Sequence, residues 1–251
     1  HMKAGASKHV VTPVAHGASS RDIHFGIGEL VVGDLNTRIK TGQGVEDDEE
    51  FWRLASQLTS GIADIHQLGI LHLAVQVCLR CLDCIVSPRP LTIPCAQPNT
   101  IFLSGRGDVR IASFYRACEI NEVKTHKPWS NPRDKAEHRA PEHEPFSFAS
   151  DMFSVGVMLF EMATGKLPDR SLDHERLLAT VNDPRKRELV SFTYHKVPSR
   201  RPTAEELLRK VMSLAPKIVS QQEITFRGSI GKTAPWGLDA SELSKWLEEH
   251  W

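Results

Sequence analysis

The stretch Phe146-Ser147-Phe148-Ala149-Ser150-Asp151-Met152-Phe153-Ser154-Val155-Gly156-Val157 decides the fold class. From Asp151 to Thr164 the side chains are apolar nearly all round, and Gly165 follows directly. A helix with apolar residues on every side is typical of the interior of a domain. A glycine just after it favours the C-terminal end of such a helix. The sequence therefore predicts a central buried helix that ends at Gly165.

Amphipathic helices are predicted on both sides of this segment along the chain. The acidic run from Glu46 to Glu50 favours a helix start, because carboxylates are stabilised at the positive end of the helix dipole. Apolar residues then recur at three- and four-residue spacing from Phe51 to Ile65, and Gly69 stands where a C-terminal cap is expected. Thr203-Ala204-Glu205-Glu206 is a capping box that predicts a further helix.

Short strands are also predicted. The apolar segments 100–103 and 109–111 flank a glycine-rich turn and indicate a hairpin. The segment 28–35 predicts a short strand followed by a turn, and Val10 to Val14 an edge strand that Pro13 makes less favourable. Because long helices dominate, the expected fold class is mainly α.

The order of these elements resembles the C-terminal lobe of eukaryotic protein kinases. The likeness rests on six motifs: Gly69-Ile70-Leu71-His72-Leu73, Pro98 to Leu103, Val109 to Tyr115, Arg139-Ala140-Pro141-Glu142, Ser150 to Gly156, and Arg201-Pro202-Thr203. The resemblance implies a helical lobe with short β-hairpins, in which the small N-terminal lobe is largely absent. It divides the chain into an N-terminal segment with a strand remnant (1–24), the kinase-like lobe (25–214) and an extension with a terminal helix (215–251).

The structural motifs of that family are kept. In the kinase pattern the glutamate of Ala-Pro-Glu pairs with the arginine before the last helix of the lobe, and these positions are Glu142 and Arg201 here. Asp151 matches the aspartate at the head of the central helix, which hydrogen-bonds backbone amides of the catalytic loop. The resemblance therefore implies structural roles for these three residues.

The chemical motifs differ from the family pattern. His72-Leu73-Ala74 stands in place of His-Arg-Asp, so a methyl group replaces the base, and Cys95 takes that position if the insertion is placed differently. Thr100 occupies the position of the metal-binding asparagine, with Asn99 directly before it. Ser113-Phe114-Tyr115 replaces Asp-Phe-Gly, the motif that supplies the second metal ligand.

These differences bear on activity. Phosphoryl transfer in protein kinases needs those acidic residues, a strand lysine and a glycine-rich loop over the phosphates, and no Gly-x-Gly-x-x-Gly precedes Glu29. We therefore expect a pseudokinase that is not an enzyme, that binds neither ATP nor Mg²⁺, and that acts as a protein-interaction scaffold or regulatory module. Two alternatives stay open. One is an atypical enzyme or allosteric subunit whose site a partner completes, and the other is a zinc-stabilised binding module.

The zinc alternative depends on a cysteine cluster. Four of the five cysteines lie in an apparent insertion within the catalytic-loop region: Cys78, Cys81, Cys84 and Cys95. Such spacing suits a tetrahedral thiolate site. Apolar residues such as Leu79 and Leu82 alternate with them, however, which favours buried cysteines without metal.

The expected class of partner follows from composition and from the tryptophans. Lysine plus arginine equals aspartate plus glutamate, so no overall positive charge favours nucleic acid. No apolar run approaches the roughly 20 residues of a membrane span, and the chain start has no signal-peptide pattern. We expect an intracellular protein, cytoplasmic or nuclear, that binds a protein or peptide segment. Three residues of the extension are candidate anchors for it, unless their helix packs back on the lobe: Trp236, Trp246 and Trp251.

Overall fold

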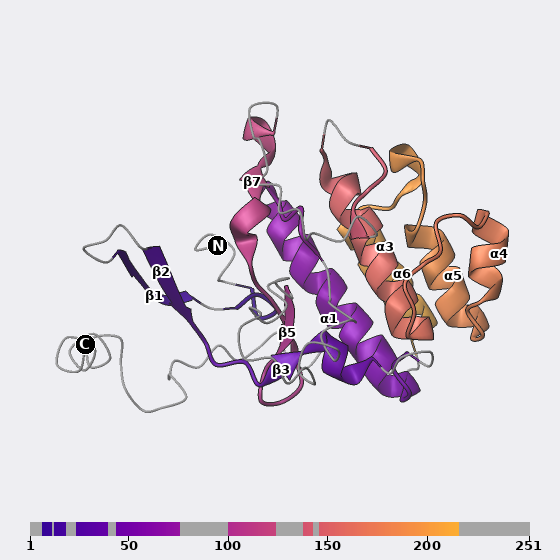
Figure 1. Cartoon of the computed structure of the whole chain (residues 1–251), viewed down its shortest axis with the longest axis horizontal. Coiled ribbons are helices and arrows are strands. Elements are labelled where there is room, and N and C mark those ends of the chain that lie inside the picture. Colours follow the sequence, from indigo (N-terminus) through magenta and orange to yellow (C-terminus); the bar gives the residue numbers. More distant parts are fainter. Residues whose placement is uncertain are drawn as a thin grey trace, which may run out of the picture.

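The computed structural model describes residues 7–11, 13–18, 24–39, 44–75, 100–123, 138–142 and 146–215. The described part is mostly helical with small antiparallel sheets, which confirms the predicted fold class. Helices α1 (Asp48–Gln67), α3 (Phe148–Thr164) and α6 (Ala204–Leu214) pack side by side, and α4 (His174–Ala179) and α5 (Pro184–Thr193) lie at one end of this group (Figure 1).

Helix α3 is the central helix that the sequence predicts. Nearly all of its side chains are buried, and it packs against both α1 and α5. Ser147 and Ser150 form a capping box at its start, and Gly165 ends it in the left-handed conformation with φ 67°. Gly156 lets α5 approach closely, because a Cβ atom there would lie 2.9 Å from the backbone nitrogen of Tyr194.

Helix α1 also forms where the sequence predicts it. The carboxylate of Asp47 caps its N-terminus by accepting hydrogen bonds from the amides of Glu49 and Glu50. Gly69 follows the helix with φ 71°, a conformation that glycine adopts without strain. The helix thus begins and ends as its acidic start and its terminal glycine indicate. The capping box at Thr203 and Glu206 likewise opens α6.

A small sheet lies on the other side of α1. Strands β3 (Gly33–Asp34), β5 (Ile101–Leu103) and β6 (Val109–Ile111) pair antiparallel in that order, so the predicted hairpin between 100 and 111 is confirmed. A second pairing joins β4 (Ile70–Leu71) to β7 (Cys118–Glu119). Because β6 leads toward β7, these two pairings bring His72 next to Ala112 and Phe114.

Short 3₁₀ helices and an N-terminal hairpin complete the described part. The 3₁₀ helices are η2 (Leu35–Arg38), η3 (Phe114–Arg116), η4 (Ile120–Glu122) and η6 (Pro198–Arg200). Strands β1 (Pro13–Ala18) and β2 (His24–Gly28) pair antiparallel and stand beside the helical group (Figure 1). The edge strand expected from Val10 to Val14 is divided differently: Val10 bridges to β6, and Pro13 is the first residue of β1. Proline is tolerated at a strand start, because no ladder hydrogen bond is needed there.

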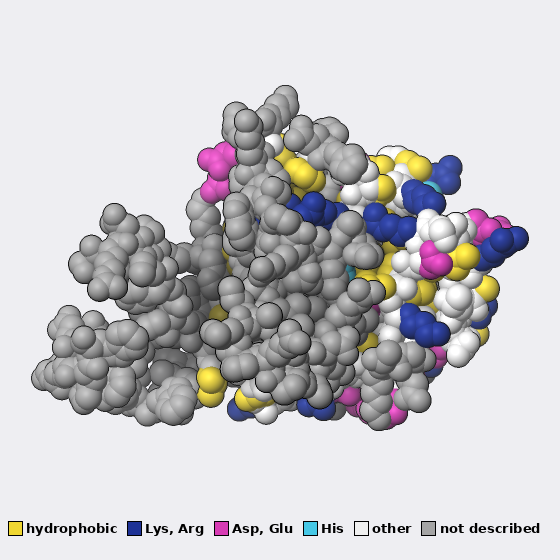
Figure 2. Space-filling view, in the orientation of Figure 1, with side chains coloured by type: hydrophobic (Ala, Val, Ile, Leu, Met, Phe, Trp, Pro, Cys, Tyr) yellow, Lys and Arg dark blue, Asp and Glu magenta, His cyan; other side chains and the backbone are white. Residues whose placement is uncertain are grey.

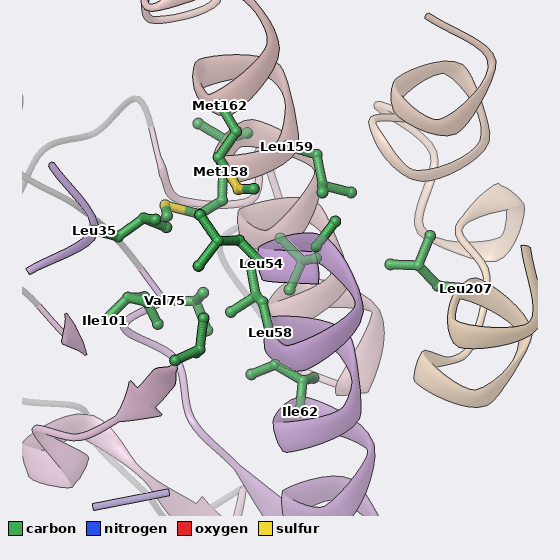
Figure 3. Packing of buried hydrophobic residues seen from close by; sticks show 14 of the residues in the cluster. Leu35, Leu54, Leu58, Ile62, Val75, Ile101, Met158, Leu159, Met162 and Leu207 are labelled. Atoms are coloured by element: carbon green, nitrogen blue, oxygen red, sulfur yellow. The ribbon is translucent and has the colours of Figure 1, made fainter. Parts of the chain in front are cut away.

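The core is formed between α1, α3 and the small sheet. Leu54, Leu58 and Ile62 of α1 are fully buried. They point toward a cluster drawn from five other parts of the chain (Figure 3): Leu35, Val75, Ile101, Met158, Leu159, Met162 and Leu207. Large buried aliphatic side chains of this kind each stabilise the fold by roughly 1.5–3 kcal/mol. Within the part of the chain that is described, no helix is both long enough and apolar enough to cross a membrane.

Candidate functional site

The carboxylate of Asp151 organises the loop that follows β4. It is fully buried in the first turn of α3 and accepts hydrogen bonds of 2.7 Å from the backbone amides of both His72 and Leu73. The Nε2 atom of His66 lies 3.1 Å from the same carboxylate. Burial opposes ionisation of Asp151, but the contacts with His66 and His72 outweigh it, so the pKa of the carboxyl lies below its ordinary value. A charged carboxylate therefore fixes residues 72 and 73.

The side chain of His72 continues this network toward β6. Its Nε2 atom lies 3.0 Å from the carbonyl oxygen of Ala112, and its ring meets the ring of Phe114 edge-on with centroids 4.8 Å apart. The amide of Ala112 in turn donates to the carbonyl of the buried Thr100. Burial is the main reason that the pKa of His72 is lowered, so the imidazole is held neutral. The structure thus brings together residues that are assigned to three separate kinase motifs.

Two residues of this site have a strained backbone. Leu73 and Ser113 are the non-glycine residues with positive φ in the described part, at 57° and 62°. This conformation costs an ordinary residue roughly 1–2 kcal/mol and persists only where the surroundings enforce it. For Leu73 the enforcing contact is the hydrogen bond from its amide to Asp151. Ala74 follows as a buried residue, and the side chain of Tyr115 lies outside what the structure describes.

A second organised region is the segment 138–142, which lies before α3. Arg201 donates two hydrogen bonds to the Glu142 carboxylate, at 2.6 and 2.8 Å, and Ser150 donates a third. Burial raises the pKa of Glu142 somewhat, but the contacts with Arg201 outweigh this, so the pKa lies below its ordinary value. Ser154 donates to the carbonyl of His138, and Arg170 donates to the carbonyl of Arg139.

A buried pair of side chains also holds this segment. The Nε2 atom of His138 lies 2.8 Å from the Oε2 atom of Glu161, and both side chains are almost completely removed from solvent. Glu161 projects from the last turn of α3. The ring of Phe153 on the same helix contacts the guanidinium groups of Arg170 and Arg201, whose Cζ atoms lie 5.1 and 5.0 Å from the ring centre. Such cation–π contacts stabilise the arginines while leaving their hydrogen bonds intact.

Other predicted site residues lie outside the described residues. These are the four clustered cysteines (Cys78, Cys81, Cys84 and Cys95) and the three tryptophans of the extension (Trp236, Trp246 and Trp251). Within the described ranges, no group of three or more His, Cys, Asp or Glu side chains is placed to hold a metal ion. The zinc alternative thus stays a prediction.

Sequence reasoning missed the roles of His138, Glu161 and Arg170. His138 directly precedes the Arg-Ala-Pro-Glu motif, and Glu161 is an acidic residue within an otherwise apolar helix. A charged residue on a helix that is buried on every side needs a partner, since burying it alone costs several kcal/mol. That mismatch was the available signal, although it does not name the partner.

Comparisons of the sequence with known proteins give partial matches to protein kinases. No protein-family model matches the chain. A putative ribosomal protein S6 kinase alpha-1 of Caenorhabditis elegans is 29% identical over 155 residues, covering 59% of this chain and 16% of that protein. Mitogen-activated protein kinase 16 of Arabidopsis thaliana is 25% identical over 240 residues, covering 84% of this chain and 38% of the relative. These matches indicate the protein-kinase-like superfamily.

A further match has the same character. The serine/threonine-protein kinase shk1/pak1 of Schizosaccharomyces pombe is 25% identical over 197 residues, covering 72% of this chain and 26% of that kinase. The chain spans at most a fifth of the S6 kinases and less than two fifths of the mitogen-activated kinase. Similarity alone therefore does not show that this kinase-like chain has the activity of these complete relatives.

The comparisons correct one expectation. The interpretation that the chain is not an enzyme is contradicted, because the matched relatives are named as protein kinases. That interpretation assigned catalytic positions by spacing across an apparent insertion. Residues 76–99, which include Asp83 and Cys95, lie outside the described part. Where the insertion is placed decides which side chain stands at the position of the base, so residue types alone did not support the conclusion.

Proposed function

We propose that this kinase-like lobe binds an extended segment of another protein along residues 138–142. The observation that carries the proposal is the way this segment is held. Its backbone and side chains are fixed from α3, from Arg170 and from Arg201, while Arg139 and Pro141 are exposed. A surface that is already rigid before binding loses little conformational entropy when a partner docks, and this favours recognition.

The contacts that fix the segment also determine what remains for a partner. The carbonyls of His138 and Arg139 already accept hydrogen bonds from Ser154 and Arg170. Recognition therefore depends on side chains, and the exposed residues of the segment include Arg139 and Pro141. On the face shown in Figure 2, Lys and Arg side chains lie among apolar, neutral and some acidic surface over the described helices. A partner segment with an acidic residue that meets Arg139 suits this surface.

The binding role needs no nucleotide or metal, because protein side chains hold the segment in place. It belongs inside the cell, in the cytoplasm or nucleus, where protein kinases exchange partners.

A peptide library selected against the full chain supplies the probe. The affinity of the selected peptide is then measured for the wild type, for Arg139→Ala and for the matched exposed-arginine control Arg209→Ala on α6. We expect Arg139→Ala to weaken binding at least about fivefold, as loss of a ~1 kcal/mol contact does. Equal affinities for all three proteins would contradict the proposal.

A second candidate function is phosphoryl transfer in a site that a partner completes. The names of the matched relatives favour it, and the Asp151 network supplies an ordered loop after β4. The test is transfer of the γ-phosphate from ATP with Mg²⁺ to a peptide mixture, with the heat-inactivated chain as control. Incorporation above that control supports this candidate. Equal incorporation with and without cell extract, at the level of the control, would contradict it.

A further inference from the structure

Residues 7–11 lie along the outer edge of β6. The amide of Val11 donates to the carbonyl of Ile111 at 2.8 Å, and the amide of Ile111 donates to the carbonyl of His9 at 2.7 Å. Val10 and Ile111 thereby form a parallel bridge. Strand β6 is paired to β5 on its other side, so this short segment acts as an added strand at the edge of the sheet.

The surface that receives the segment is shaped for a close approach. Gly61 of α1 faces it, and a Cβ atom at that position would lie 2.9 Å from the Cβ of His9 and 2.7 Å from the Cδ1 of Ile111. Val10 is completely buried, and Val11 is 8% exposed. At the start of the segment, the hydroxyl of Ser7 donates to the carboxylate of Asp64 on α1. Gly61, the edge of β6 and the carboxylate of Asp64 thus form a surface that holds an extended chain.

The occupant carries one unfavourable feature. The imidazole of His9 is 3% exposed, and neither ring nitrogen has a hydrogen-bond partner of normal geometry within the described residues. Burial of an unpaired polar group costs desolvation free energy, and no hydrogen bond compensates for this cost. The positive side chains of Lys8 and Arg110 lie near the ring, and only Asp108 and the backbone of Val109 act in the opposite direction. The segment therefore binds the edge of β6 and α1 less tightly than burial of Val10 and Val11 alone would predict.

We propose that the edge of β6, with Gly61 and Asp64 of α1, is a strand-docking site for an extended protein segment, which residues 7–11 occupy as a displaceable intramolecular ligand. The partner is a segment in β conformation with β-branched apolar residues at the positions of Val10 and Val11 and a hydroxyl residue at that of Ser7. Strand addition supplies backbone hydrogen bonds, and the buried side chains supply selectivity. This inference does not depend on the function proposed for residues 138–142, since it concerns a different surface.

The test uses a fluorescent peptide with the sequence of residues 5–14 and two full-length proteins. In the first the intramolecular segment is intact, and in the second Val10→Asp places a charge in the buried position and releases it. We expect the peptide to bind the Val10→Asp protein at least tenfold more tightly than the wild type. A peptide that itself carries Val10→Asp is the matched control and is expected not to bind. Equally weak binding of the first peptide to both proteins, with the variant folded by circular dichroism, would overturn the proposal.

Native-state amide exchange of the unmodified chain gives an independent measurement, which holds even if the variant fails to fold. The amide of Ile111 is protected by the carbonyl of His9, whereas the amide of Leu159 is protected inside α3. Release of the segment without unfolding predicts that Ile111 exchanges at least tenfold faster than Leu159. If both amides exchange at the rate of global unfolding, the segment is a fixed part of the fold and the proposal is wrong.

Discussion

Arg201 and Glu142 are separated by 59 positions in the sequence and form a bidentate ion pair, with Nη1–Oε1 at 2.6 Å and Nη2–Oε2 at 2.8 Å. The same guanidinium also donates to the carbonyls of His195, Ala149 and Lys196. Its side chain is completely buried, whereas that of Glu142 keeps 18% exposure. One arginine thus joins the segment before α3, the start of α3 and the loop before α6.

Arg201→Lys tests this junction while keeping the positive charge. An ammonium group has three donors and no planar fork, so it cannot serve all of these acceptors at once. We expect the variant to lose roughly 2–3 kcal/mol of unfolding free energy, since buried acceptors are left unpaired. Urea denaturation measures this loss, and Arg209→Lys on the exposed side of α6 is the control. A change within about 0.5 kcal/mol for both variants would contradict the assigned role.

Asp151→Asn tests the carboxylate that holds the loop after β4. The amide group keeps one acceptor oxygen, but its NH₂ group faces a backbone N–H that needs an acceptor. We expect a loss of roughly 2–4 kcal/mol in unfolding free energy, because the amide of His72 is buried and that of Leu73 is partly buried. The substitution Glu175→Gln at an exposed position of α4 is the control and is expected to change stability by less than about 0.5 kcal/mol. An Asp151→Asn protein as stable as the wild type would show that the charge is dispensable.

Gly156→Ala tests the close approach of α3 and α5. In an exposed helix this change would stabilise by about 1 kcal/mol. Here the new methyl group would lie 2.9 and 3.0 Å from the backbone N and Cα of Tyr194, so one helix has to move. We expect a net loss of roughly 1–3 kcal/mol, the usual range for overpacking. The matched variant is Gly105→Ala, whose methyl group would come no closer than 4.0 Å to Val32. Thermal unfolding of both proteins makes the comparison.

Stability is expected to fall in mild acid because of His9. Burial, with Lys8 and Arg110 adding to it, lowers the pKa of His9 from 6.5 to about 4. The unfolded chain therefore takes up this proton first, and stability is lost as the pH falls from 6.5 toward 4. The loss is about 3 kcal/mol for a shift of this size. Two carboxylates face the segment that contains His9. Asp108 lies near the imidazole ring, and Asp64 accepts the hydrogen bond from Ser7.

His9→Leu isolates this contribution. The variant keeps His72 and the carboxylates, so only the titration of residue 9 is removed. Between pH 6.5 and 4, the unfolding free energy of the variant is expected to fall less steeply than that of the wild type. Denaturation curves at a series of pH values measure both slopes, and parallel slopes would exclude a role for His9.

Much of the fold could be predicted from the sequence because its signals are local. The ends of α1 and α3, the hairpin around 104–108 and the cap of α6 depend on nearby glycines, carboxylates and hydroxyls. The contacts of the site are different in kind. His138 meets Glu161, and Ser7 meets Asp64, through the packing of distant segments. No spacing rule predicts such pairs, since they form only after the helices are in place.

The family resemblance was informative for a related reason. It placed Glu142, Arg201 and Asp151 by motif, and the structure describes each of them in a dense set of hydrogen bonds. It was misleading for activity, because the position of the base depends on an insertion whose placement no motif determines. The conclusion that the chain is not an enzyme rested on residue types alone and was wrong. The roles of Glu142, Arg201 and Asp151 rested on motifs, and the structure describes hydrogen bonds for each of them.

The measurement that tests the central claim most directly is an NMR titration of the full chain with the peptide selected from the library. Binding along residues 138–142 predicts that the amide resonances of Arg139, Ala140 and Glu142 shift in a saturable manner, while those of α4 at the far end of the helical group stay in place. Shifts that saturate elsewhere, with the resonances of 138–142 unchanged, would contradict the account.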